Sequence, residues 1–350
     1  MGLFLVLLAL VLALTLPRLL LARYGFRGVS YQLHFSEDEV SEGDTVYLTE
    51  TVVNRKLLPL PWLKAELTTH AALDFAAAQS AVSEETRFVS SHFSLMPYQR
   101  IERRWKVKCT RRGIFTVSRA VIVLTDLFGT SELSEPMPEA FAEITVLPAV
   151  HPVDALPIPA DAVSGEYIRS RMLIPDRFAV CGIRHYLPGD ALRDISQTAS
   201  ARTEQPMVWQ YQETVTPALS IVLLMNTRPR DRDAVSDKAR FEDAVRVCAA
   251  YAWLAGQMKI SVRFCTNAEI GGNAVCGQFS AGDAAVLSIL RTLSALPYDI
   301  AGKPETLVQQ VCADDASAVL IIGGYIAPEI AAYAQHNDRI MLLPVGNQAS

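Results

Sequence analysis

The sequence lacks the features of several large functional classes. It has 32 Lys and Arg residues against 37 Asp and Glu, a formal net charge of -5, which argues against a dedicated nucleic-acid binder, because affinity for phosphates needs an excess of clustered Lys and Arg. Its six cysteines are widely spaced and form no C-x-x-C pair, which argues against a zinc knuckle or a redox dithiol. We therefore expect no nucleic-acid partner and predict mostly reduced core thiols at Cys109, Cys181, Cys248, Cys265, Cys276 and Cys312.

Catalytic motifs are also missing. The sequence has neither a glycine-rich phosphate loop nor a G-x-S-x-G elbow, and its six histidines are dispersed. One exception is His185, which lies beside Tyr186 with Asp190 as an orienting carboxylate. No nucleophile accompanies it, so we predict no enzymatic activity, no cofactor and no metal. The alternative is an enzyme of unknown reaction centred on His185, Tyr186 and Asp190.

Residues 1–23 form an apolar run that predicts one transmembrane anchor. Arg18, Arg23 and Arg27 lie at or after its end, and the positive-inside bias then places the soluble portion in the cytoplasm. Unpaired cysteines agree with that compartment. A cleaved signal peptide is the rival interpretation, but it should carry basic residues before the run and small residues after it. A third possibility is an envelope protein whose sandwich lies outside the cell.

Residues 28–148 carry short apolar runs that alternate with period two and are separated by turn residues. Examples are residues 44–55 and 103–126. No long amphipathic helix interrupts them, so we predict an antiparallel β-sandwich of immunoglobulin-like character. Within it, residues 100–112 are strongly basic. This segment is either a docking face for acidic lipid headgroups or an acidic partner, or a solvated strand protected by charge from aggregation.

The spacing of apolar residues changes in the second half of the chain. Residues 149–216 begin with a proline-rich linker and continue into a polar segment. Residues 217–350 alternate between apolar strands and helical patterns, which predicts a parallel sheet with helices on both faces. The predicted strands are 218–226, 259–267, 316–324 and 339–346, and the predicted helices are 237–258, 281–296 and 327–336.

Ligands of open parallel sheets gather at the carboxyl ends of the strands. After the first strand the chain reads "MNTRPRDR", which combines a neutral Asn226 with three arginines and suits a hard cation poorly. Asp231 and Asp233 are in principle ligands for a divalent ion. We favour the interpretation that they pair with the neighbouring arginines at the surface.

The polar stretch "GIRHYLPGDALRDISQTASAR" resembles the signature of the DUF58 family (domain of unknown function 58), which reads approximately R-x-Y-x-P-G-D-x-x-R-x-I-x-W-x-x-S-A-R. A second resemblance is the D-x-F-G segment at Asp126, Phe128 and Gly129. The matching signature positions are Arg184, Tyr186, Pro188, Gly189, Asp190, Arg193, Ile195, Ser200, Ala201 and Arg202.

This resemblance implies a membrane-anchored protein whose C-terminal half is similar to a von Willebrand factor A domain and whose partner is a MoxR-type AAA+ ATPase. It implies a role in assembly or maturation of other proteins. Gln197 departs from the family by replacing the signature Trp. The D-x-S-x-S metal site of A-type domains also appears degenerate, because its positions correspond to Asn226, Arg228 and Arg230.

Two interpretations of the signature stay open. Asp190 follows the Pro188-Gly189 turn and is suited to cap a helix that begins near Ala191. In the first interpretation, the surrounding arginines form a polar network that joins the two halves of the chain. In the second, they form a surface for a protein partner. We predict a non-enzymatic, membrane-anchored scaffold or interaction protein, with the signature serving structure or partner binding.

Overall fold

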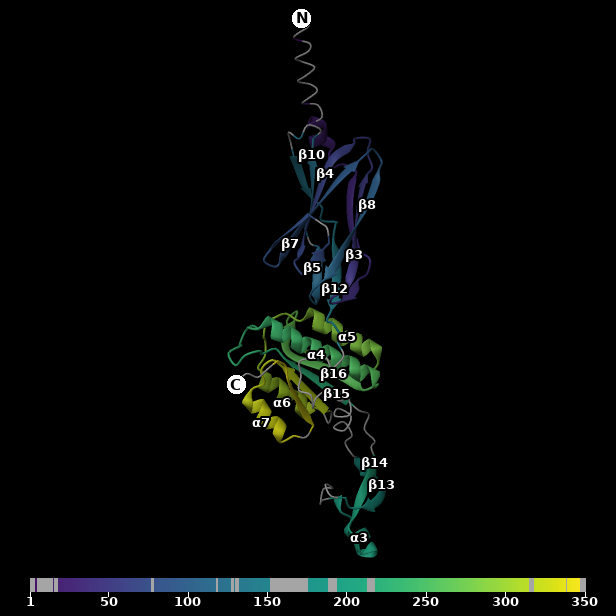
Figure 1. The fold of residues 1–350 in the computed structure, drawn as a ribbon, viewed down its shortest axis with the longest axis vertical. Coiled ribbons are helices and arrows are strands. Elements are labelled where there is room, and N and C mark those ends of the chain that lie inside the picture. The colour runs from purple at the N-terminus through teal and green to yellow at the C-terminus, as the bar shows by residue number, and fades with distance from the viewer. Residues whose placement is uncertain are drawn as a thin grey trace. The chain divides into compact units, whose positions relative to one another are not determined.

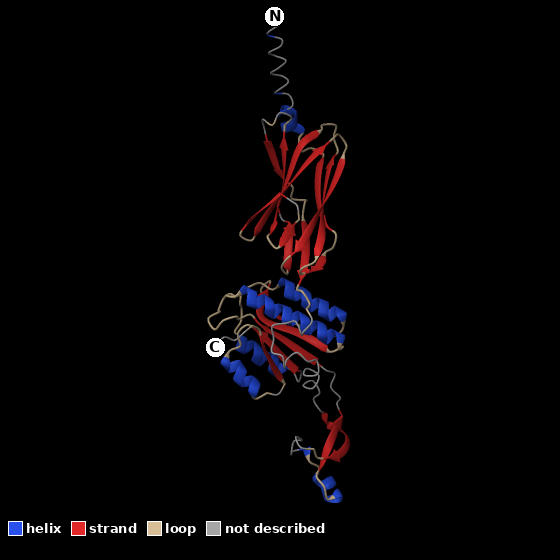
Figure 2. Cartoon of the chain, in the orientation of Figure 1, coloured by secondary structure: helices blue, strands red, loops and turns tan. Residues whose placement is uncertain are grey.

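The computed structural model divides the chain into two compact units, one formed mainly by Met1–Ala149 and one mainly by Val150–Thr292 with Leu296–Ser350. Figures 1 and 2 show a first unit built mainly of strands, with a short helical segment at residues 18–24, and a second unit of strands and helices. The structure describes residues 4, 15, 18–76, 79–117, 119–126, 129, 132–151, 176–187, 194–212, 218–314, 318–337 and 339–346.

The first unit is a β-sandwich, and it confirms the predicted antiparallel β domain. Its sheets have the strand orders β1-β3-β8-β5, β11-β10-β4-β7-β6 and β2-β12-β9, and all pairs are antiparallel except β2 with β12. The strands are β1 (Val29–Phe35), β2 (Glu39–Ser41), β3 (Thr45–Asn54), β4 (Leu60–His70), β5 (Leu73–Phe75), β6 (Gln79–Ser83), β7 (Thr86–Leu95), β8 (Arg100–Cys109), β9 (Gly113–Val117), β10 (Arg119–Thr125), β11 (Glu132–Pro136) and β12 (Ala142–Leu147).

Alternation along these strands builds the sandwich core. In β4, Leu63, Ala65 and Leu67 are at most 1% exposed, whereas Lys64 and Glu66 between them point outward. Successive strand side chains face opposite sides of a sheet, so this period-two pattern buries one face of each strand. The buried side chains of several strands form one apolar cluster, which includes Leu48, Leu73, Ile122 and Ile144.

The carboxyl group of Glu50 lies inside this core. Glu50 on β3 is fully buried, and both of its carboxylate oxygens accept from the Ser91 hydroxyl at 3.0 and 2.8 Å. Burial raises the pKa of Glu50, and the hydrogen bond from Ser91 opposes that rise. The polar pair links β3 to β7 and thus ties two sheets of the sandwich together.

The second unit contains a five-stranded mixed sheet with the order β17-β16-β15-β18-β19. The four strands predicted from apolar runs are present and parallel, but β17 pairs antiparallel with β16. The sheet is therefore not all parallel. The strands are β15 (Ala218–Leu224), β16 (Ser261–Ile270), β17 (Asn273–Cys276), β18 (Ala318–Gly323) and β19 (Ile340–Pro344).

Helices cover both faces of this sheet, with α4 and α5 on one side and α6 and α7 on the other (Figures 1 and 2). Gly256 of α4 allows close helix packing, because a Cβ there would lie 2.4 Å from Cγ2 of Val286 on α5. Three helices were predicted from sequence, and α6 was missed. Their bounds are α4 (Lys238–Gln257), α5 (Asp283–Ala295), α6 (Pro304–Asp314) and α7 (Pro328–Gln335).

Residues 149–216 contain more regular structure than the predicted linker. Strand β13 (Asp176–His185) pairs antiparallel with β14 (Met207–Gln212), and helix α3 (Gln197–Thr203) lies between them in sequence. The Ser196 side chain caps α3 by accepting from the Ala199 N–H at 3.3 Å. The sequence analysis had not predicted this hairpin.

The predicted membrane anchor lies largely outside the described residues. Within the described part of the chain, no helix has the length and apolar character needed to cross a bilayer.

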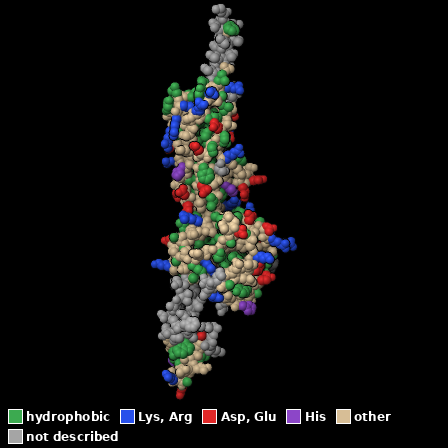
Figure 3. Space-filling view, turned by 180° about the vertical axis from the view of Figure 1, so that it is seen from behind, with side chains coloured by type: hydrophobic (Ala, Val, Ile, Leu, Met, Phe, Trp, Pro, Cys, Tyr) green, Lys and Arg blue, Asp and Glu red, His purple; other side chains and the backbone are tan. Residues whose placement is uncertain are grey.

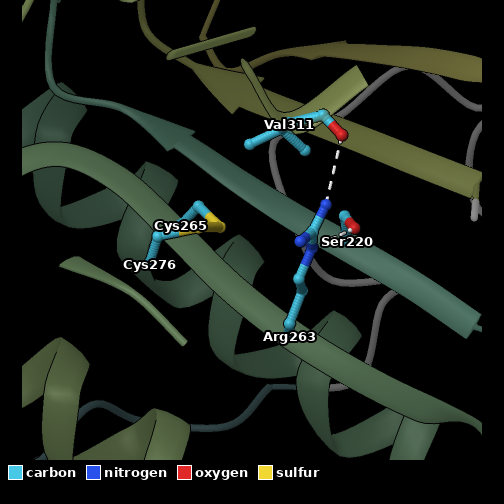
Figure 4. Close-up of a disulfide and its surroundings, with 5 residues drawn as sticks. All are labelled: Ser220, Arg263, Cys265, Cys276 and Val311. Atoms are coloured by element: carbon cyan, nitrogen blue, oxygen red, sulfur yellow. Dashed lines mark hydrogen bonds between the residues drawn. A yellow bond between two sulfur atoms is a disulfide. The ribbon is translucent and has the colours of Figure 1, made fainter. Parts of the chain in front are cut away.

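The cysteines require a correction, because Cys265 and Cys276 form a disulfide rather than two reduced thiols (Figure 4). They are direct partners in the antiparallel register of β16 and β17, with Cα atoms 4.1 Å apart. The prediction failed because β17 itself was not predicted. Cys109, Cys248 and Cys312 are free, as expected, and Cys109 and Cys248 are buried.

The disulfide predicts a defined loss of stability. Replacing Cys276→Ser removes the cross-link between two strands and lowers the free energy of unfolding by about 3 kcal/mol, as expected for a short closed loop. Chemical denaturation under non-reducing conditions measures the change, and Cys312→Ser is the control. Alkylation of both Cys265 and Cys276 in unreduced, unfolded protein would contradict the disulfide.

Candidate functional site

The carboxyl edge of the mixed sheet is the expected place for a ligand. Asn226 and Thr227 follow the end of β15, Asn267 lies on β16, and Gly323 ends β18. The pairing of β15 with both neighbours brings these chain segments together. The contacts of their side chains decide whether the edge is open to a ligand.

The Asp231 carboxylate organises the loop after β15. One of its oxygens, Oδ2, accepts from the Thr227 N–H at 2.8 Å, the Thr227 hydroxyl at 2.6 Å and the Arg228 N–H at 3.0 Å. The other oxygen, Oδ1, accepts from the Ser236 hydroxyl. Four donors from the same loop therefore converge on one carboxylate, and Asp231 is only 6% exposed.

These bonds set the charge of Asp231. Burial by itself raises the pKa of a carboxyl group, but the hydrogen bonds from Ser236, Thr227 and Arg228 outweigh it and hold the pKa of Asp231 below its ordinary value. The carboxylate is thus ionised at neutral pH, and the internal donors stabilise its charge.

Two buried amides continue the network. Asn226 donates from Nδ2 to the Asp231 carbonyl at 2.9 Å, and its Oδ1 accepts from Asn267 Nδ2 at 3.2 Å. Asn267 in turn accepts the Met225 N–H through Oδ1 at 2.9 Å and donates to the Gly302 carbonyl at 3.1 Å. The amide groups that would face a ligand are bonded within the protein.

Arg240 fills the space beside this loop. A Cβ on Gly324 would lie 2.7 Å from Arg240 Cδ, and one on Gly346, where φ is +85°, would lie 3.2 Å from Arg240 Nε. Glycine at both positions thus accommodates an arginine of the same chain. Arg240 also donates to the Thr227 carbonyl at 3.5 Å.

The three degenerate metal-site positions do not form a ligand set. Asn226 is buried, whereas Arg228 and Arg230 are exposed. Arg228 lies 3.8 Å from Asp237. Within the described residues no group of three or more His, Cys, Asp or Glu side chains could hold a metal ion.

The expected surface pairing of Asp231 with arginine side chains is wrong. Its hydrogen-bond partners are hydroxyl and backbone N–H groups, and its side chain is buried. The neighbouring Asp233 is exposed, as expected. This outcome could not be predicted from sequence, because the donors are hydroxyl and backbone groups of Thr227, Arg228 and Ser236, which belong to no recognised motif.

The signature residues that the structure describes belong to the β13–β14 hairpin and α3. The Ser200 hydroxyl accepts the Met207 N–H at 2.8 Å, and Arg184 donates to the neighbouring His185 carbonyl at 3.1 Å. Ile195 forms an isolated bridge with Val208. Tyr186, Ala201 and Arg202 are also described, whereas Pro188, Gly189, Asp190 and Arg193 lie outside the described residues. The helix cap predicted for Asp190 therefore stays a prediction.

One face of this hairpin is apolar and exposed. Ile183 and Trp209 are register partners, and they are 41% and 37% exposed. Leu187 continues the same alternation and is 58% exposed, while Val208 on the opposite side is buried. His185 lies on the exposed face too, and Tyr186 points the other way. The hairpin thus carries an exposed face of Ile183, Leu187 and Trp209 (the hairpin face).

A substitution at Asp231 tests the closed network. Asp231→Ala leaves four donors without an acceptor and lowers the free energy of unfolding by about 3 kcal/mol. Asp231→Asn lowers the free energy of unfolding by less, and its difference from the unmodified protein becomes smaller in acid. A carboxylate with a lowered pKa stabilises the fold above its ordinary pKa, and this stabilisation is lost as the pH falls through the pKa of the folded state.

Urea denaturation between neutral and acidic pH measures both changes, with Asp233→Asn as the matched exposed control. Equal stability of the Asp231 and Asp233 variants would contradict the internal role of Asp231.

Comparisons with known proteins give a family for part of the chain. Residues 182–338 match the family described as "Protein of unknown function DUF58". A comparison with curated proteins found no match.

Several solved structures share a limited likeness. The CARDB domain of the PF1109 protein from Pyrococcus furiosus is 14% identical with a TM-score of 0.24, over 35% of this chain and 91% of that one. A non-cellulosomal cohesin from Archaeoglobus fulgidus is 10% identical with a TM-score of 0.25, over 34% and 91%. The bacterial hydrophobin BslA is 14% identical with a TM-score of 0.23, over 35% and 97%. Likenesses this low carry no argument about function.

Proposed function

The chain contains a DUF58 domain at residues 182–338, and from this premise we propose that it is a non-enzymatic, membrane-anchored interaction protein. The closed carboxyl edge carries the proposal. Asp231 is occupied by four internal donors, and Arg240 packs against Gly324. An edge filled by its own side chains is suited to presenting a surface rather than to binding a metal or a substrate.

The finer fold assignments belong to the same proposal. We assign the α/β unit to the von Willebrand factor A type and the sandwich to the immunoglobulin-like type. The parallel core of β15, β16, β18 and β19, with helices on both faces, supports the first assignment. The antiparallel sheets of the first unit support the second.

The proposed partner is a protein, namely a MoxR-type AAA+ ATPase, and the proposed role is assembly or maturation of other proteins. The hairpin face is the best candidate for the contact. Exposed Trp and Leu side chains that gather on one surface are typical of protein interfaces. This face lies inside the DUF58 domain, next to the signature residues Arg184 and Tyr186.

Two observations disagree about the side of the membrane on which the soluble portion lies. Arg18, Arg23 and Arg27 favour a cytoplasmic soluble portion. The Cys265–Cys276 disulfide favours an oxidising compartment instead. We retain the cytoplasmic location as the proposal, and labelling of Cys276 with an impermeant thiol reagent in intact cells, after mild reduction, distinguishes the two.

The alternative is an enzyme centred on His185, Tyr186 and Asp190. His185 and Tyr186 are neighbours on β13 and its extension, and successive strand residues point to opposite faces. That arrangement separates the two side chains. An enzyme of this kind would lose its activity in Asp190→Asn while keeping its thermal stability.

Divalent cations provide the first test. If the carboxyl edge is closed, millimolar Mg²⁺ or Mn²⁺ leaves the melting temperature of the protein unchanged, because a ligand stabilises a fold only when it binds the native state. Differential scanning calorimetry measures this, with EDTA-treated protein as the reference. A clear rise in melting temperature with either cation would count against the proposal.

The hairpin face provides the second test. Trp209→Ser combined with Leu187→Ser lowers co-purification of the ATPase by at least about tenfold, because a buried interface tryptophan commonly contributes 2 kcal/mol or more. The matched control is Trp253→Ser, since Trp253 is 47% exposed on α4. Equal recovery of the ATPase with the double variant and the control would contradict the assignment of the hairpin face as the contact with the ATPase.

A further inference from the structure

Three connecting segments meet at one end of the β-sandwich: residues 18–28, 55–59 and 96–99. The Arg55 N–H donates to the Gly28 carbonyl at 2.7 Å, and the Tyr98 N–H donates to the Lys56 carbonyl at 3.3 Å. The side chain of Asn54 adds a third link by donating to the Met96 carbonyl at 3.0 Å. These contacts hold the segments as one surface, which we call the anchor-end surface.

The anchor-end surface exposes large apolar and aromatic side chains. Leu57, Tyr98 and Met96 are 74%, 70% and 66% exposed, among the highest values for large hydrophobic side chains in the described residues. Leu19 and Tyr24 add further exposed area. Apolar side chains gathered at one place mark a binding surface more often than single exposed residues do.

The charge of this surface has one sign. Its three segments contain no Asp or Glu, and their cations are Arg18, Arg23, Arg27, Arg55 and Lys56. All of these except Lys56 are exposed. Figure 3 shows Lys and Arg side chains beside apolar ones at the end of the sandwich where the N-terminal segment joins it. Asp126, which follows β10, is buried.

The N-terminal segment is fixed to this surface. Leu21 is 6% exposed and belongs to the sandwich core, and its carbonyl accepts the Gly25 N–H at 2.7 Å. The Lys56 ammonium donates to the carbonyls of Gly25 and Tyr24, the latter at 2.8 Å. Partial burial lowers the pKa of Lys56 to about 8. The apolar run before residue 21 therefore leaves the sandwich from a defined place.

Tyr98 has an unusual backbone conformation at this surface. Its φ is 58°, a left-handed conformation that costs energy for a residue with a Cβ. Glycine would relieve that cost, yet an aromatic side chain is present and points into solvent. Strained backbone of this kind is found preferentially at functional positions.

From these observations we propose that the anchor-end surface docks onto an anionic lipid bilayer, with Leu57, Met96 and Tyr98 in the interfacial region and the arginines at the headgroups. Tyr and Arg side chains beside exposed apolar residues are the composition of a membrane interface. The uniform positive charge complements anionic headgroups. Continuity with the apolar run places this surface next to the bilayer, so the inference rests on the membrane anchoring proposed above.

The bilayer is distinguished from a free anion or a protein by the mixed chemistry of the surface. A free phosphate needs the arginines alone and leaves Leu57, Met96 and Tyr98 in water. A control position for this surface lies at the opposite end of β3. Tyr47 is 49% exposed there and lies about 20 Å from the anchor end, at 3.3 Å of rise per residue.

The test measures contact between this surface and lipid in the full chain. Tyr98→Trp and, separately, Leu57→Trp are reconstituted into vesicles of phosphatidylcholine with phosphatidylglycerol that carry brominated acyl chains, which quench nearby tryptophan. We expect the added emission to fall by about twofold for both variants, as for side chains in the interface. Tyr47→Trp, the matched control, is not quenched. Replacing Arg27 and Arg55 with Gln, or omitting phosphatidylglycerol, reduces the quenching.

Flotation of the same vesicles separates the two ways of failing. Protein that does not float with the lipid overturns both the anchor and the docking surface. Protein that floats while Tyr98→Trp and Leu57→Trp are quenched no more than Tyr47→Trp overturns docking alone. Quenching that is unchanged by phosphatidylglycerol and by the arginine substitutions overturns the role assigned to the charge.

Discussion

The Asp231 carboxylate is the interaction on which the carboxyl edge of the α/β unit depends. It is charged and nearly buried, and hydroxyl and backbone N–H donors of Thr227, Arg228 and Ser236 in its own loop stabilise the charge. Removing any donor would leave part of a buried charge unpaired, which costs more than an ordinary hydrogen bond. The same bonds that fix the loop also occupy the carboxyl end of β15, where open α/β sheets commonly bind ligands.

If the edge is closed, recognition must use other surfaces, and the structure offers two of them in different units. The hairpin face of Ile183, Leu187 and Trp209 is apolar and exposed, which suits a protein. The anchor-end surface mixes apolar side chains with arginines, which suits a bilayer. The two surfaces differ in charge, as their proposed partners do, and together they fit the proposal of a protein that is held at a membrane while it binds another.

Much of the fold could be predicted from the sequence, because burial imposes its own period on a strand. The apolar runs that became β15, β16, β18 and β19 were identified to within a few residues. The strand β17 and the disulfide to Cys276 were missed, since an exposed edge strand carries no apolar run. The Asp231 network was also beyond prediction. Its donors are mainly backbone and hydroxyl groups positioned by the loop, and Asn267 reaches it only through the pairing of β15 with β16.

Hydrogen exchange of the full chain, with and without a candidate MoxR-type ATPase and with and without Mg²⁺, tests the central claim most directly. The account predicts that, among residues 226–236, the amides of Thr227, Arg228, Asp231 and Val235 exchange slowly in every condition, since each of these N–H groups is bonded within the protein. It also predicts that the ATPase protects residues 183–187 and 207–209. Protection of residues 226–236 that appears only with Mg²⁺ or with the ATPase, and no change in the hairpin, would contradict it.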